Sequence, residues 1–122
     1  MKIGKHFEFE ASHILPKHPG KCGRMHGHSY KLTVLVDGPV EKDSGMVIDF
    51  FAIKDIVKEE ILNKYDHRHM NDYFDNPTSE NMAQEFFKVI NEKLKKKTNG
   101  KVKLSSLRLY ETSNSFAEVN GK

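Results

Sequence analysis

The sequence predicts an α+β fold in which one antiparallel sheet of four strands is covered on one face by two helices. Segments near both ends of the chain alternate apolar and polar residues with period two, and two segments between them repeat apolar residues at helical spacing. The predicted order is strand, strand, helix, helix, strand, strand. Each helix has a single apolar face, so both are expected on the same side of the sheet. With 122 residues, the chain is expected to form one domain.

The first two predicted strands cover residues 2–15 and 29–37. One face of the first strand carries apolar residues and ends in a histidine: Phe7, Phe9, Ala11 and His13. The matching face of the second strand carries Tyr30, Leu32, Val34 and Val36. Continued backwards, the same alternation places His26 and His28 on the Tyr30 face, with Gly27 between them.

The helices are predicted over residues 50–64 and from the Thr78–Ser79 pair to Asn99–Gly100. Asp49 is placed to cap the first helix, whose expected apolar stripe is Phe50, Ile53, Val57 and Ile61. Hydroxyl side chains and an acidic residue start the second helix, and Asn99–Gly100 is a typical helix end. Residues 65–76 lack periodicity, which favours a connecting segment rich in titratable groups.

The last two strands are predicted from Val102 onward and over residues 116–119. Leu107 and Leu109 share a face with Glu111, and a glutamate at the end of an apolar stripe is costly to bury unless it is paired. Glu111 is therefore either exposed at the strand's edge or faces a pocket. In a pocket its carboxylate can accept two parallel hydrogen bonds from an N–H and NH₂ pair, as in a guanine-like or pterin ring.

Three histidines are candidates for one metal site. If the first two strands pair antiparallel through the intervening loop, His13 lies beside His26 and His28. Three neutral imidazoles without a fourth protein ligand leave an open position, which is typical of a catalytic zinc. Each histidine alone is more simply an ordinary half-buried strand residue. A structural zinc would need a fourth ligand, and Cys22 is the only nearby thiol.

A second candidate group is Asp66 beside His67, since a carboxylate can fix the tautomer of an imidazole and raise its basicity. Adjacent side chains often point apart, so the spacing alone is a weak signal.

Composition narrows the class of partner. Charged residues make up 30% of the chain and the net charge is +3, which suits an anionic small molecule. A basic stripe interleaved with aromatic residues, as expected for nucleic-acid binding, is absent from the sequence, as is a membrane-spanning segment. The single cysteine and a start that leads directly into strand pattern are expected of a protein kept in the reducing cytoplasm.

Several blocks together resemble the 6-pyruvoyl-tetrahydropterin synthase family over nearly the whole chain. They are Phe9–His13, Cys22–Tyr30, Ile48–Phe50, Tyr65–Asn71, Pro77–Asn81 and Glu111–Thr112. Three residues separate the cysteine from the His-Gly-His element, as in the carboxy branch of the family, which acts in queuosine biosynthesis. A further branch has glutamate in place of the cysteine, whereas this sequence has Cys22.

The resemblance implies a tunnelling fold whose subunits associate into a barrel, commonly a hexamer, with active sites between subunits. It implies 7,8-dihydroneopterin triphosphate as substrate and Zn²⁺ as cofactor. The implied roles are zinc binding by His13, His26 and His28, a base in Cys22, a proton relay of Asp66 and His67, and substrate contacts from Glu111, Thr112, Thr78 and Ser79.

Three points stay open at this level. Arg24 and Arg68 are candidates for holding the triphosphate. The expected product is 6-carboxy-5,6,7,8-tetrahydropterin with acetaldehyde, and the alternative in the same fold is triphosphate elimination alone, giving 6-pyruvoyl-tetrahydropterin. A non-catalytic pterin- or zinc-binding module is the alternative from a different class.

Overall fold

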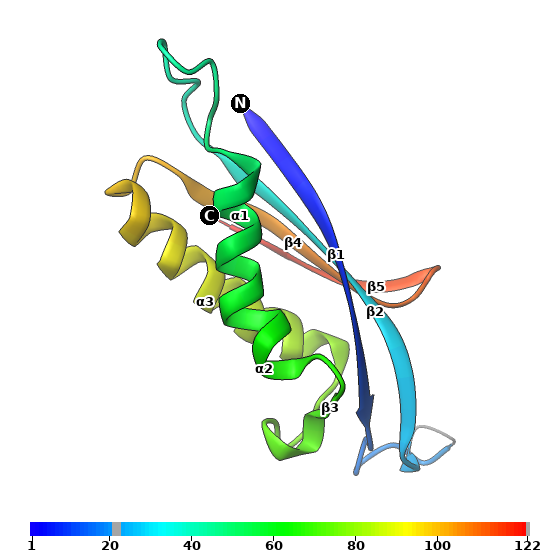
Figure 1. Ribbon diagram of the computed structural model, residues 1–122. Helices are drawn as coiled ribbons and strands as arrows, with labels where there is room; N and C mark the ends of the chain where they lie inside the picture. The colour runs from blue at the N-terminus through cyan, green and yellow to red at the C-terminus, as the bar shows by residue number, and fades with distance from the viewer. Residues whose placement is uncertain (21–22, 122) are drawn as a thin grey trace.

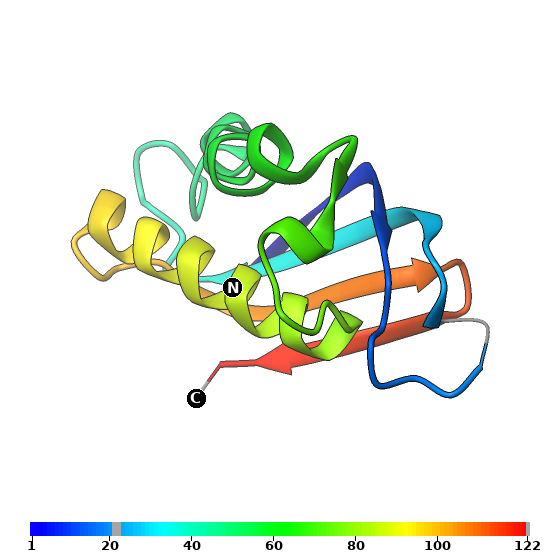
Figure 2. The ribbon, with the colours of Figure 1, turned by 90° about the horizontal axis from the view of Figure 1, so that it is seen from below.

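The computed structural model describes residues 1–20 and 23–121. Its elements are β1 (Lys2–His13), β2 (His26–Asp37), α1 (Phe50–Val57), a π-helical turn η2 (Lys58–Leu62), α2 (Asn63–Tyr65), β3 (Arg68–His69), a 3₁₀ turn η3 (Met70–Asp72), α3 (Ser79–Thr98), β4 (Lys103–Thr112) and β5 (Ser115–Asn120). The strands form one sheet in the order β3-β1-β2-β4-β5, antiparallel except for the β1–β3 pair. Figures 1 and 2 show α1 and α3 on the same side of this sheet. The predicted α+β class is confirmed.

The sheet has one strand more than the four predicted. β3 pairs in parallel with Ala11 and Ser12 of β1, and it lies in the segment that the sequence indicated as a connection. A strand of two residues cannot show an alternation of period two, so the pattern carried no signal for it.

The core lies between the sheet and the two helices. The apolar faces of β1 and β2 are buried as their alternation predicts, and Tyr30, Leu32, Val34 and Val36 are fully buried. Phe9 stacks on Tyr30 with ring centroids 5.1 Å apart and meets the edge of Phe86 from α3 at 6.1 Å. Complete burial of one large apolar side chain contributes about 1.5–3 kcal/mol to the stability of the fold. These residues therefore determine which face of the sheet packs against the helices.

The start of α1 differs in one respect from the prediction. The Asp49 carboxylate accepts a hydrogen bond from the Phe51 N–H at 2.9 Å, so the cap is where the sequence placed it. Phe50, predicted to belong to the apolar stripe, is 49% exposed. It is the first residue of α1, and this helix meets the core only from Ile53 onward. The buried stripe is Ile53, Ile56, Val57 and Ile61.

A π-helical turn interrupts the first helix at Lys58–Leu62. Such turns place one extra residue in the helix and are frequent near functional sites. Beyond it, Tyr65 reaches the aromatic cluster, with its ring centroid 5.2 Å from that of Phe86. The helical segment ends where the Asp66 N–H donates to the Leu62 carbonyl at 3.1 Å, and Asp66 itself turns toward β1.

Both ends of α3 carry the signals expected from the sequence. The Thr78 hydroxyl accepts a hydrogen bond from the Asn81 N–H at 3.1 Å, which caps the first turn. Asn99 ends the helix in the left-handed conformation at φ 53°, followed by Gly100 at φ 81°. None of the helices in the described part of the chain has the length and hydrophobicity needed to cross a membrane.

Truncation of Phe86 tests this core. The Phe86→Ala variant should lose about 3–5 kcal/mol of unfolding free energy, because it empties the space between Phe9, Tyr65 and Phe74. Urea unfolding followed by circular dichroism measures the loss. Phe51→Ala is the matched control, since Phe51 is 72% exposed and should change stability by less than about 0.5 kcal/mol. Equal losses in the two variants would contradict this packing.

Candidate active site

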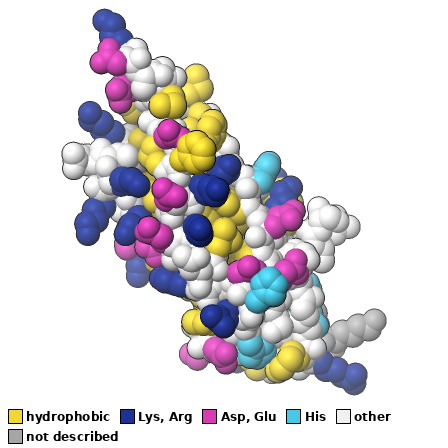
Figure 3. All heavy atoms as spheres, viewed as in Figure 1, with side chains coloured by type: hydrophobic (Ala, Val, Ile, Leu, Met, Phe, Trp, Pro, Cys, Tyr) yellow, Lys and Arg dark blue, Asp and Glu magenta, His cyan; other side chains and the backbone are white. Residues whose placement is uncertain are grey.

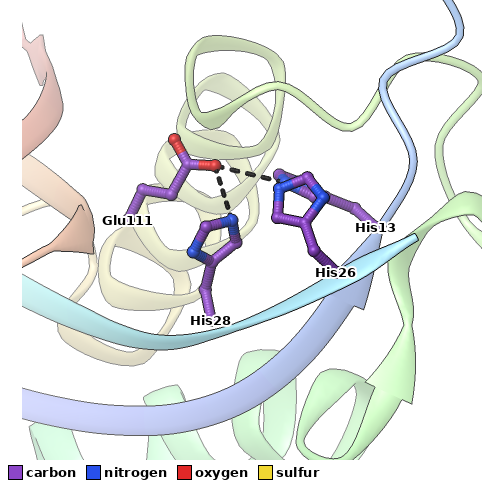
Figure 4. Close-up of side chains that lie close together, drawn as sticks. All are labelled: His13, His26, His28 and Glu111. Atoms are coloured by element: carbon purple, nitrogen blue, oxygen red, sulfur yellow. Dashed lines mark hydrogen bonds and ion pairs between the residues drawn. The ribbon is translucent and has the colours of Figure 1, made fainter. Parts of the chain in front are cut away.

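Four side chains converge where β1 ends and β2 begins. The register pairs His13 with His26 and Ala11 with His28, so both strands deliver histidines to one place. Glu111, near the end of β4, reaches the same place from the other side of β2 (Figure 4). The Nε2 atoms of His13 and His26 are 2.9 Å apart, and Glu111 Oε1 lies 3.2 Å from His13 Nε2 and 3.0 Å from His28 Nε2. The four donor atoms all lie within 4.8 Å of one another, so the group can hold a metal ion.

Backbone carbonyls fix the tautomers of two of these histidines. His13 Nδ1 lies 2.9 Å from the Pro77 carbonyl oxygen, and His26 Nδ1 lies 2.7 Å from the Arg24 carbonyl oxygen. A carbonyl only accepts, so each Nδ1 carries the hydrogen and each Nε2 presents a lone pair. In these tautomers the lone pairs of the two Nε2 atoms, which are 2.9 Å apart, point at each other. That arrangement is repulsive unless a cation lies between them.

His28 gives independent evidence that a cation belongs among these side chains. His28 Nε2 is buried and has no hydrogen-bond partner among the described residues. It lies 3.0 Å from Glu111 Oε1, within ion-pair distance but without hydrogen-bond geometry. A buried polar atom without a partner is costly, and a metal ion would satisfy it. Nitrogen and carboxylate oxygen donors in this number suit zinc.

Burial favours the neutral form of two of the histidines. It lowers the pKa of His13 and of His28, against the opposing attraction of the Glu111 carboxylate. Beneath them Tyr30 is fully buried with its hydroxyl 3.1 Å from His13 Nδ1, and burial also raises the pKa of this phenol. The lowered pKa values favour the unprotonated form of His13 and His28, which is the form that binds a metal.

A side chain from η3 holds the end of β1 in place. The Asn71 amide oxygen accepts from the Ile14 N–H, and its amide nitrogen donates to the Ile14 carbonyl, each at 2.8 Å. The Asn71 amide thus makes the two hydrogen bonds that a residue of a neighbouring strand would make. It continues the hydrogen bonding of β1 by one residue beyond His13. The roles of Asn71 and of the two carbonyls were not predictable from the sequence, because nothing in a one-dimensional pattern shows which backbone groups meet in the fold.

Asp66 and His67 form a pair at the outer edge of β1. Asp66 Oδ1 lies 3.0 Å from His67 Nδ1 and accepts from the Glu10 N–H at 2.9 Å, and the Glu10 contact chiefly lowers the pKa of this carboxyl. His67 has a left-handed backbone at φ 60°, which is uncommon for a residue with a side chain. The left-handed backbone at His67 brings its imidazole into contact with the carboxylate of the preceding residue, Asp66. Within the described residues no hydrogen bond or ion pair links the pair to the histidine cluster.

His67 stands at the surface with other polar groups. Its side chain is 77% exposed and lines a cavity of about 510 Å³ together with Arg68, His69, Gly27 and His28. Figure 3 shows histidine side chains beside acidic ones on the lower half of this face. Arg68, one of the two triphosphate candidates, is thus near His67, whereas Arg24 is exposed and holds His26 through its carbonyl.

The four predicted substrate contacts divide into two pairs. Ser79 and Glu111 line a cavity of about 320 Å³, and the Ser79 hydroxyl lies 3.5 Å from Glu111 Oε2. The Thr78 hydroxyl caps α3, and the Thr112 hydroxyl lies 3.0 Å from Asn114 Oδ1 in the turn after β4. The predicted base, Cys22, lies outside the described residues.

The sequence profile described as 6-pyruvoyl tetrahydropterin synthase matches residues 2–122. The chain belongs to this family. It is 36% identical over 138 residues to the 6-carboxy-5,6,7,8-tetrahydropterin synthase of Haemophilus influenzae, covering 96% of each chain. It is 38% identical over 121 residues to the protein of the same name from Synechocystis, covering 94% of this chain and 89% of the relative.

Two further relatives carry other names within the same fold. Dihydroneopterin monophosphate aldolase of Pyrococcus furiosus is 37% identical over 103 residues, covering 84% of this chain and 82% of that protein. The solved structure of 6-pyruvoyl tetrahydropterin synthase from Caenorhabditis elegans superposes with a TM-score of 0.86 at 25% identity, covering 100% of this chain and 96% of that one. Relatives of this chain thus carry the names of more than one pterin enzyme.

Removal of one imidazole tests the metal group. We expect His28→Ala to lower zinc affinity by at least about 100-fold, because a donor is lost from a buried group. Metal content after dialysis, measured by mass spectrometry, should fall from about one zinc per chain to near zero. His6→Ala is the control, since His6 is exposed and bonds to Thr33 away from the cluster. Equal zinc content in the two variants would contradict the site.

The backbone of His67 gives a test that does not depend on activity. Both His67→Ala and His67→Gly remove the imidazole and its ion pair, but only glycine relieves the left-handed conformation. The glycine variant should therefore be more stable than the alanine variant by about 1 kcal/mol in urea unfolding. At exposed Lys88 inside α3 the order should reverse, with alanine more stable by about 1 kcal/mol. Alanine more stable than glycine at both positions would show that residue 67 is not strained.

Proposed function

We propose that this protein is a zinc-dependent 6-carboxy-5,6,7,8-tetrahydropterin synthase. The reaction converts 7,8-dihydroneopterin triphosphate to 6-carboxy-5,6,7,8-tetrahydropterin, acetaldehyde and triphosphate, in the pathway to queuosine. The observation that carries the proposal is the group of three converging histidine Nε2 atoms, next to a cavity lined by Ser79 and Glu111, in a chain of this family. The names of the Haemophilus and Synechocystis relatives support the choice of reaction.

His13, His26 and His28 would hold the zinc ion. When bound there, zinc supplies a Lewis acid that lowers the pKa of neighbouring hydroxyls and stabilises developing negative charge. Glu111 would anchor the pterin ring, because its carboxylate can accept from the ring N–H and the adjacent NH₂ together. The Ser79 hydroxyl, 3.5 Å from Glu111 Oε2, lies at the same cavity and would support that orientation.

Two groups would move protons. Cys22, as a thiolate, would take the carbon-bound proton of the substrate side chain. His67 would exchange a proton on the other side of that carbon through Nε2, because Asp66 Oδ1 lies 3.0 Å from Nδ1 and can hold the hydrogen there. The low pKa of Asp66 keeps that carboxylate ionised at neutral pH. A cysteine that must remain a free thiol suits the reducing cytoplasm.

The position of His67 supports an assembly with shared active sites. β3 pairs with β1 only at Ala11 and Ser12, and β5 pairs with β4 alone, so both edges of the sheet offer backbone groups for pairing. We propose that copies of the chain join through these edges into a closed barrel, in a hexamer. Asp66 and His67 lie at one of these edges, so they would serve the zinc group of a neighbouring subunit.

Product analysis tests the reaction. Zinc-loaded protein incubated with 7,8-dihydroneopterin triphosphate should give carboxytetrahydropterin by mass spectrometry and an equal amount of acetaldehyde. The Cys22→Ala variant should keep its zinc and lose turnover by about 10²–10⁴-fold, because the base is lost while the metal donors remain. Met25→Leu, an exposed change in the same loop, is the control for handling and folding.

Other products would point elsewhere in the family. A stable pyruvoyl product without acetaldehyde would identify triphosphate elimination alone. Release of a two-carbon aldehyde that still carries the triphosphate, together with a 6-hydroxymethyl pterin, would identify an aldolase. Unchanged substrate with a Cys22→Ala variant that still binds a pterin would favour a non-catalytic module.

A further inference from the structure

The two oxygens of the Glu111 carboxylate face different partners. Oε1 lies among the histidines, 3.2 Å from His13 Nε2 and 3.0 Å from His28 Nε2. Oε2 faces the Ser79 hydroxyl at 3.5 Å, beside the cavity of about 320 Å³. The side chain is 27% exposed, so it is not locked in place by packing. Figure 4 shows the carboxylate directed at the imidazole rings, while its other oxygen points away from them.

The position of Oε1 suits a fourth metal ligand. Two ligand atoms that each lie about 2.0–2.1 Å from a tetrahedral zinc are about 3.3 Å apart. Oε1 lies 3.2 Å from His13 Nε2 and 3.0 Å from His28 Nε2, close to that separation, and all four donor atoms lie within 4.8 Å of one another. Oε1 therefore occupies the place of a ligand as well as the imidazole nitrogens do. This differs from a site that has only three protein donors and one open position.

Anchoring of a pterin ring makes a competing demand on the same carboxylate. The N–H and NH₂ pair of the ring needs both oxygens side by side on the ligand. Oε1 cannot serve the ring in this way while it lies at the metal. The two uses exclude each other, so by linkage each must weaken the other.

We propose that Glu111 is the fourth ligand of the ion held by His13, His26 and His28 in the resting protein, and that an arriving pterin ring displaces it. The identity of the displacing ligand rests on the proposed function. Displacement removes one negative charge from the ion's ligands and opens the fourth position when substrate is present. The ion is then most strongly polarising at the time that its chemistry is needed.

Cobalt spectroscopy tests this exchange without turnover. Co²⁺ replaces zinc, and its visible absorption reports the ligands directly; neopterin, which lacks the triphosphate, serves as the probe. Glu111→Gln should lower Co²⁺ affinity by about tenfold or more and change the resting spectrum. Glu80→Gln is the matched control, because Glu80 lines the same cavity but is not in the donor group, and its resting spectrum should equal that of the wild type.

Saturating neopterin should shift the wild-type spectrum and weaken Co²⁺ binding, whereas the Glu111→Gln spectrum should not respond. An unchanged resting spectrum and affinity in Glu111→Gln would show that Glu111 is not a ligand. A wild-type spectrum that stays constant while neopterin binds, as followed by fluorescence, would show that no exchange occurs. In both cases acetaldehyde production would leave the proposed function standing. A protein that binds no neopterin and converts no substrate would overturn the function and the exchange together.

Discussion

The register between β1 and β2 is the constraint on which the site depends. Side chains alternate between the two faces of a strand, so a slip of one residue would move His26 and His28 from the core face to the opposite one. The register is held by the burial of Phe9 against Tyr30 and by the apolar stripe that continues to Val36. The same packing that stabilises the core therefore sets His13 opposite His26.

Backbone groups, as well as side chains, orient the residues that could hold a metal ion. The carbonyls of Pro77 and Arg24 decide which nitrogen of His13 and His26 is free to bind an ion. Pro77 is buried just before α3, and Arg24 is exposed just before β2. Two segments that are distant in sequence therefore orient the Nε2 atoms of His13 and His26. Imidazoles oriented in this way need little rearrangement when the ion binds, which favours a tight and selective site.

Much of the fold was predictable because it depends on short-range patterns. Alternation located the four long strands, and caps located the helices down to Asp49, Thr78 and Asn99. β3 is too short, and the π turn too irregular, to produce a periodic pattern of apolar residues in the sequence. The exposure of Phe50 depends on where the helix meets the sheet, which its own sequence does not specify. At the site, same-face positions predicted the convergence of the histidines. The approach of Glu111 to them depends on the pairing of β2 with β4, which no local pattern specifies.

The π turn at Lys58–Leu62 also determines where the first helix places Asp66 and His67. An α-helix rotates by about 100° per residue, so loss of one residue from this turn would swing everything after it around the helix axis. Tyr65 would leave the aromatic cluster, and Asp66 would no longer face the Glu10 N–H. The position of the Asp66–His67 pair thus depends on the rotation set by the helix about two turns before it. Changes in chain length there would alter the site although no residue of the site is replaced.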